Sequence, residues 1–111
     1  MKSLISTLVV LAALSALSAA QSKQTFTGVI TDNMCARANH ASMRMGPTDA
    51  DCTKACVSAH DAKYVLFDGK EVYTLSDQKT PEKFAAQKVA VVGTLDVKTK
   101  TIQVDSMTAA K

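Results

Sequence analysis

The sequence predicts a small, mainly β domain with short helices, arranged as a five-stranded barrel. Three observations lead to this fold class. Five segments rich in β-branched and aromatic residues follow one another along the chain. Two of them contain a glycine, Gly28 or Gly93, at which a tightly curved strand can bend. A helix-start pattern lies between the third and the fourth segment.

The first predicted strand covers residues 25–31 (TFTGVIT) and places Phe26, Gly28 and Ile30 on one face. The composition then changes over residues 33–62, which lack β-branched runs and contain Asn, Gly, Pro and several Ala. We therefore predict an insertion between the first two strands.

Within this insertion a short helix is predicted over about residues 50–59, capped by Thr48 or Asp49. The period of 3.6 residues would place one group of side chains on a shared helix face. These are Cys52, Ala55, Cys56, Ala59 and His60.

The rest of the chain predicts four more strands and one more short helix. Asp68 and Gly69 are typical of a hairpin turn. Thr80 and Pro81 are a cap and a first-turn proline, and Phe84 is the expected core anchor of the helix that they start. In chain order these elements are strands at 64–67 and 71–75, a helix at 81–87, and strands at 89–95 and 101–107.

Five strands with a helix between the third and the fourth match a small OB-like barrel. An open antiparallel sheet with helices on one side is the alternative architecture. The predicted domain covers residues 21–111, and the helical Cys/His insertion occupies about 33–62 between strands 1 and 2.

The first twenty residues have the pattern of a secretory signal peptide. Lys2 precedes an apolar run over residues 4–17, which is short compared with the roughly twenty residues of a membrane span. Ser18 and Ala20 are small residues suited to cleavage before Gln21. We therefore expect residues 1–20 to be removed and the protein to be periplasmic or secreted.

The charges of the chain do not indicate a nucleic-acid partner. Lys and Arg number 13 and Asp and Glu 10, and the two signs are interspersed, without a basic block and without Trp. A nucleic-acid-binding surface would need a concentrated basic face. No second apolar run is long enough to span a bilayer, so no membrane span is expected after signal cleavage.

Four stretches of the chain resemble a family of small exported bacterial proteins of unknown function with an OB-like domain. They are TFTGVITDNMC, CTKACV, AKYVLFDGKEVYTLSDQ and FAAQKVAVVGTLD. The resemblance covers nearly all of the chain after the signal peptide. It implies an exported β-barrel with a Cys-bearing insertion and implies no established activity. The family usually has Gly where this chain has Ala86.

All the cysteines and histidines of the chain lie in the insertion: Cys35, His40, Cys52, Cys56 and His60. Met34, Met43 and Met45 lie there too. This uneven placement indicates a site built from the insertion, with the barrel as its support. The five Cys and His residues are candidate metal ligands. Thiolate, imidazole and thioether together favour copper(I), whereas Cys and His alone would equally suit zinc.

A disulfide is the competing interpretation, because exported small domains often use such bridges. Cys35 could pair with Cys56 or, slightly less favoured, with Cys52. Closing such a loop would stabilise the fold by about 3 kcal/mol on the chain-entropy model. Cys52 and Cys56 lie one helical turn apart and could pair only with distortion.

The residues predict a binding module rather than an enzyme. The chain has no Ser-His-Asp order, no glycine-rich phosphate loop and no evident acid–base pair. The leading hypothesis is an exported module that binds copper or zinc through its Cys/His/Met cluster. The alternative is a disulfide-stapled structural or interaction domain without metal, which would bind a partner or a small ligand. Thiol-redox activity ranks third, because the Cys spacing is not C-x-x-C.

Overall fold

The structure is a computed structural model that describes residues 22–41 and 44–111. The predicted signal peptide, residues 1–20, therefore lies outside the described residues. The elements follow one another as β1 (Gln24–Asp32), η1 (Asn33–Cys35), α2 (Asp49–His60), β2 (Tyr64–Phe67), β3 (Val72–Leu75), η2 (Thr80–Phe84), β4 (Lys88–Asp96) and β5 (Thr101–Ala109). The prediction of a mainly β domain with short helices is confirmed.

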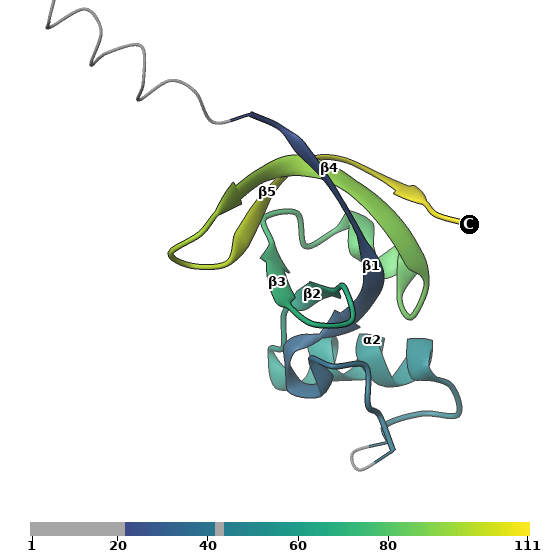
Figure 1. Cartoon of the computed structure of the whole chain (residues 1–111). Coiled ribbons are helices and arrows are strands. Elements are labelled where there is room, and N and C mark those ends of the chain that lie inside the picture. The colour runs from purple at the N-terminus through teal and green to yellow at the C-terminus, as the bar shows by residue number, and fades with distance from the viewer. Residues whose placement is uncertain (1–21, 42–43) are drawn as a thin grey trace, which may run out of the picture.

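The five strands form one mixed sheet in which every strand pairs with two neighbours (Figure 1). The strand order is β1-β2-β3-β5-β4, and β4 pairs back with β1. The β3–β5 pair is parallel, through Thr74–Thr101 and Leu75–Ile102, and the other pairs are antiparallel. The sheet is therefore not wholly antiparallel, as the alternative architecture would require.

Strand β1 is shared between two partners, and this requires Gly28. Its first half pairs with β4 up to Val29, and its second half pairs with β2 from Val29 to Asp32. A side chain at Gly28 would place its Cβ only 2.4 Å from the carbonyl oxygen of Phe67. The backbone of β2 therefore approaches β1 closely at a position that has no room for a side chain.

The apolar core lies between the strands. Its buried members are Ile30, Tyr64, Leu66, Leu75, Val89, Val91 and Ile102. They alternate with more exposed residues along β4, as the period of two in a strand requires. Burying such side chains is the main favourable contribution to folding, at about 25 cal/mol per Å² of apolar surface.

The second predicted helix is a 3-10 helix, Thr80–Phe84, which is shorter than the predicted range 81–87. Thr80, the predicted cap, is instead the first residue of this helix; the N-cap is Lys79, and the carboxylate of Asp77 accepts from the backbone N–H groups of Lys79 and Thr80. The chain then turns into β4 through Ala86, which has a φ of 63°. A left-handed backbone favours glycine, because a residue with a Cβ is strained there.

Helix α2 packs against β1 and lies at the end of the sheet where that strand finishes (Figure 1). Its cap is Thr48, whose hydroxyl accepts from the N–H of Asp51 at 3.1 Å, so the predicted cap is confirmed. The helix ends at Asp61, which has a left-handed backbone with a φ of 54°. The insertion thus forms a layer of its own beside the sheet.

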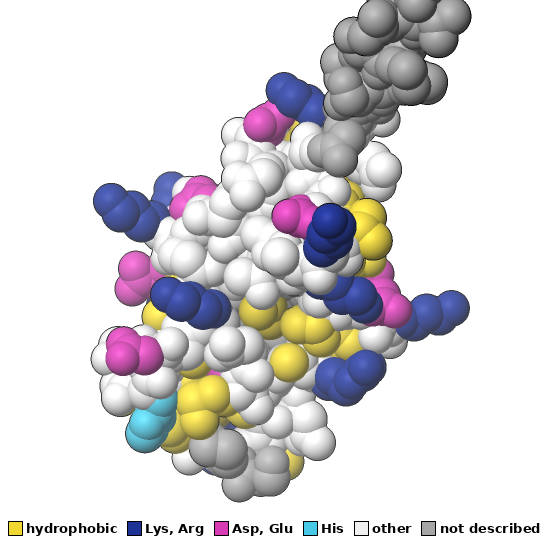
Figure 2. All heavy atoms as spheres, turned by 90° about the vertical axis from the view of Figure 1, so that its left-hand side faces the viewer, with side chains coloured by type: hydrophobic (Ala, Val, Ile, Leu, Met, Phe, Trp, Pro, Cys, Tyr) yellow, Lys and Arg dark blue, Asp and Glu magenta, His cyan; other side chains and the backbone are white. Residues whose placement is uncertain are grey.

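The surface carries interspersed charges. On the face drawn in Figure 2, basic and acidic side chains alternate, with apolar side chains between them. Within residues 22–41 and 44–111, no helix is both long and apolar enough to cross a bilayer.

Candidate metal centre

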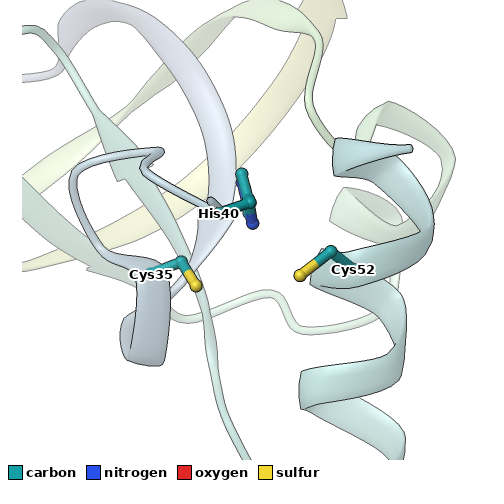
Figure 3. A group of neighbouring side chains, drawn as sticks. All are labelled: Cys35, His40 and Cys52. Atoms are coloured by element: carbon teal, nitrogen blue, oxygen red, sulfur yellow. The ribbon is translucent and has the colours of Figure 1, made fainter. Parts of the chain in front are cut away.

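Cys35, His40 and Cys52 converge at the junction between the insertion and β1 (Figure 3). One ligand atom from each residue lies within 4.8 Å of the other two. All three side chains are buried, with exposed fractions of 6%, 3% and 0%. The group could hold a metal ion, because two sulfurs and an imidazole nitrogen are ligands for zinc and copper.

Cys35 is held in place by a tight turn that follows β1. The Asp32 carboxylate accepts from the backbone N–H groups of Met34 and Cys35, at 3.1 and 3.0 Å. The hydroxyl of Thr31 donates to the carbonyl of Cys35 at 3.0 Å. These bonds satisfy the polar groups of η1 within a buried region and fix the direction of the Cys35 side chain.

Cys52 is held from the opposite side by α2. It lies in the first turn of the helix, where its backbone N–H donates to the carbonyl of Thr48 at 2.9 Å. Its sulfur accepts from the backbone N–H of Met45 at 3.3 Å. Hydrogen bonds of this kind orient a ligand sulfur at a metal site.

His40 reaches the cluster from the loop that connects η1 to α2. Its side chain is buried, and its Nδ1 atom has no hydrogen-bond partner within the described residues. Its sequence neighbour Asn39 is a residue type typical of turns. Tertiary packing instead places the imidazole next to the two sulfurs.

Cys56 and Met45 extend the group by two further sulfurs. The thiol of Cys56 donates to the thioether of Met45 across 3.8 Å, and Cys56 itself is fully buried. Cys56 lies one turn after Cys52 on α2, on the same buried side of the helix. It is therefore adjacent to the Cys35/His40/Cys52 group, although it is not one of its three members.

His60 does not join the cluster. It lies in the last turn of α2 with an exposed side chain, so the predicted common face of Cys52, Cys56 and His60 is wrong at its far end. The physical reason is helical drift, since a spacing of four residues rotates by about 40° beyond a full turn at each step. After two steps the His60 side chain points to solvent, where it can interact favourably with the negative end of the helix dipole.

No disulfide links the three cysteines in this structure, so neither Cys35–Cys56 nor Cys35–Cys52 is bridged. The sulfurs instead share one buried region with the imidazole of His40 and the thioether of Met45. The disulfide interpretation paired two of the three cysteines. In the structure, three thiols from η1 and α2 lie together instead.

Two buried polar atoms beside the thiols have no hydrogen-bond partner in the described part of the chain: Nδ1 of His40 and Oδ1 of Asp32. Asp32 is fully buried, and none of the ion pairs found among the described residues includes it. Buried polar groups in folded proteins are nearly always satisfied, and a bound ion or ordered water commonly accounts for the exceptions. A ligand or an ordered water at this place would satisfy these atoms.

Raised pKa values of Cys35 and Cys56 are unfavourable to redox catalysis by these two thiols. Burial, together with the negative charge of Asp32, raises the pKa of Cys56 to about 12. The same two causes raise the pKa of Cys35 above its usual value. Reactive cysteines have lowered pKa values and some exposure, whereas these thiols are buried in acidic surroundings.

Sequence reasoning found the cysteines and His40 but missed the role of Asp32. An Asp at the end of a strand, followed by Asn, is a pattern for capping the next turn, and this local signal was present in the sequence. The contact between Met45 and the cysteine sulfurs had no such signal, because it depends on how the loop folds over α2.

Comparisons with protein-family models, with curated proteins and with solved structures found no match to this chain. The function must therefore be inferred from the site itself.

Proposed function

We propose that this protein binds a soft or borderline transition-metal ion, copper or zinc, through Cys35, His40 and Cys52, with Cys56 as an adjacent fourth ligand. The observation that carries the proposal is the convergence of their ligand atoms in a buried region. Three sulfurs and one imidazole form a four-ligand set that suits zinc, and thiolates also suit copper(I).

The unpaired Nδ1 atom of His40 supports this proposal. A buried imidazole nitrogen without a partner is costly, and a metal at the cluster would remove that cost. Oδ1 of Asp32 would be satisfied in the same way by a cation or by a water molecule bound to it. Binding would displace protons from the thiols, which must be deprotonated to act as ligands.

The architecture that carries the site is proposed to be an OB-like barrel. The closed strand order, the parallel β3–β5 pair and the short helix η2 between β3 and β4 support this assignment. On this proposal the sheet acts as a rigid frame. The metal ties η1 and the following loop to α2, which otherwise contacts the sheet mainly through β1.

We also propose that the protein is exported and works in the periplasm or outside the cell. Lys2, the apolar run over residues 4–17 and the small residues before Gln21 support this proposal. The intact mass of the protein recovered from the periplasm or medium tests it. A chain that begins at Gln21 is expected, whereas a full-length chain retained in the cytoplasm would contradict export.

The metal proposal is tested on the purified, reduced protein by measuring bound metal and by titration with Co²⁺. Thiolate ligation is expected to give sulfur-to-cobalt charge-transfer absorption at one ion per chain. Thiol counts with and without reductant distinguish a metal site from a disulfide. One free thiol and no metal would overturn the proposal in favour of the bridge.

The two histidines provide a matched pair of variants. His40→Gln is expected to weaken metal binding by about tenfold or more, because loss of even a supporting residue at a metal site commonly has that effect. His60→Gln, at an exposed position, is expected to bind like the unchanged protein. Equal metal affinity of both variants would contradict the assignment of His40 as a ligand.

A further inference from the structure

Met45 is held against the proposed metal centre by two contacts, one from its backbone and one from its side chain. Its backbone N–H donates to the sulfur of Cys52 at 3.3 Å, and its thioether accepts from the thiol of Cys56 at 3.8 Å. The residue is half-buried, so it lies between the buried cluster and solvent. Met45 therefore touches both cysteines of α2, through its backbone and its side chain.

The residues on both sides of Met45 fix this placement. Arg44 forms an ion pair with Asp49 in the first turn of α2, at 2.9 Å. Gly46 has a φ of 141°, and a Cβ there would lie 2.7 Å from the Cβ of Asp51. Only glycine allows this close approach of the loop to the helix, so the backbone at Gly46 directs Met45 toward the sulfurs.

We propose that the thioether of Met45 is the fourth ligand when copper(I) is bound, in place of the Cys56 thiolate, and that it makes the site selective for copper(I) over zinc. This inference rests on the proposed metal-binding function and specifies the metal. A thioether is a soft, neutral donor that binds copper(I), whereas zinc sites use Cys, His and carboxylate ligands.

The charge of the surroundings also favours neutral ligands. Asp32 already places a fully buried negative charge beside the cysteines. Each additional thiolate would add another negative charge in a region of low dielectric, where repulsion between like charges is strong. The thioether of Met45 and the imidazole of His40 bind a monovalent ion without adding charge, which lowers the electrostatic cost of holding copper(I) here.

Metal competition under anaerobic, reducing conditions tests this inference. Copper(I) affinity is measured against a chromophoric copper(I) chelator, and zinc affinity against a chromophoric zinc chelator. The variant is Met45→Leu, which keeps the volume of the side chain and removes its sulfur. The control is Met107→Leu, on β5, where the methionine packs against the apolar core.

For Met45→Leu we expect the copper(I) dissociation constant to rise by about tenfold or more, as for the loss of other groups at metal sites. The zinc dissociation constant should stay unchanged, and Met107→Leu should alter neither. X-ray absorption of the copper(I) protein should show one sulfur fewer around the metal in the variant. Met45→Gln, a second variant of similar length, is expected to show the same selective loss.

The outcomes separate this inference from the proposed function. Equal copper(I) binding in Met45→Leu and in the unchanged protein, with His40→Gln still impaired, would overturn the role of Met45 and leave the metal site standing. A parallel loss of zinc and copper(I) affinity would show that Met45 acts only on the shape of the site. Failure of the unchanged protein to bind either metal would overturn both proposals.

Discussion

The thiol of Cys56 on α2 and the thioether of Met45, eleven positions earlier in the chain, meet at 3.8 Å beside the Cys35/His40/Cys52 group. The contact brings the loop before α2 onto the same helix face that carries Cys52. Soft donor atoms from the turn after β1, from the loop and from α2 are thereby gathered at one end of the sheet. The stability of these three segments should depend on the residues that position them.

Asp32 is expected to position Cys35 through its hydrogen bonds rather than through its charge. Asp32→Asn keeps an oxygen that can accept from the N–H groups of Met34 and Cys35, and it removes a buried carboxylate that has no ion-pair partner among the described residues. Without metal this variant should be as stable as the unchanged protein or more stable, because burying an unpaired charge is costly. Asp32→Ala should lose about 1 kcal/mol, the usual contribution of such a cap.

Urea unfolding in the presence of chelator and reductant measures the free energy of unfolding of both Asp32 variants. Equal destabilisation by Asn and Ala would contradict this prediction, since it would mean that the negative charge itself stabilises the turn.

Thr48 is expected to stabilise α2 and, through it, the position of Cys52. Thr48→Ala removes the acceptor of the Asp51 N–H and should lower the free energy of unfolding by about 1 kcal/mol. Thr48→Ser keeps the hydroxyl and should behave like the unchanged protein. Urea unfolding followed by circular dichroism checks this pair. If Thr48→Ser lowers the free energy of unfolding as much as Thr48→Ala does, the methyl group and not the hydroxyl supports the helix.

Ala86 is expected to be a site of backbone strain. Its φ of 63° lies in the left-handed region, which costs a residue with a Cβ about 1–2 kcal/mol relative to glycine. The greater entropy of glycine in the unfolded chain offsets about 0.4–1 kcal/mol of that gain. Ala86→Gly should therefore raise the free energy of unfolding by several tenths of a kcal/mol or more, on the balance of these effects.

The control for Ala86 is Ala90→Gly, in the middle of β4, where glycine should destabilise the strand. Thermal unfolding of the two variants gives the sign directly. A lower melting temperature for both would show that Ala86 is not strained.

Asp68 is expected to make stability depend on acidic pH. Backbone N–H groups of Glu71 and Lys70 donate to its carboxylate and hold the pKa of Asp68 below its usual value. Because the pKa of Asp68 is lower in the folded state than in the unfolded state, its carboxylate stabilises the fold. This stabilisation is complete above the unfolded-state pKa of about 3.9. It is lost as the pH falls through the folded-state pKa. The effect should be small, since Asp68 is exposed and its charge is screened by solvent.

The measurement for Asp68 is urea unfolding at several pH values between neutral and strongly acidic. Asp68→Asn should be less stable than the unchanged protein near neutral pH and should approach it at the acidic end. Glu82→Gln, at an exposed position in η2, controls for the loss of one negative charge. A constant difference between Asp68→Asn and the unchanged protein at every pH would contradict the prediction.

The fold could be predicted from the sequence wherever a local pattern decides it. The segment YVLF predicts a strand over residues 64–67, and β2 has those bounds. Thr48 and the following residues predict a capped helix over about 50–59, and α2 runs from Asp49 to His60. Periodicity and caps are properties of neighbouring residues, so they can be read without knowing what packs against them.

The sequence by itself determined the mainly β class, the helix in the insertion and the residue types from which a metal site could be built. Tertiary structure decided which of these residues meet. It brings His40 to Cys35 and Cys52, turns His60 to solvent, and adds Met45 beside Cys56. The physical reason is that these choices depend on contacts between η1, the loop and α2, whose relative placement no local pattern contains. The same reason explains the parallel β3–β5 pair, which only the packing of distant strands could set.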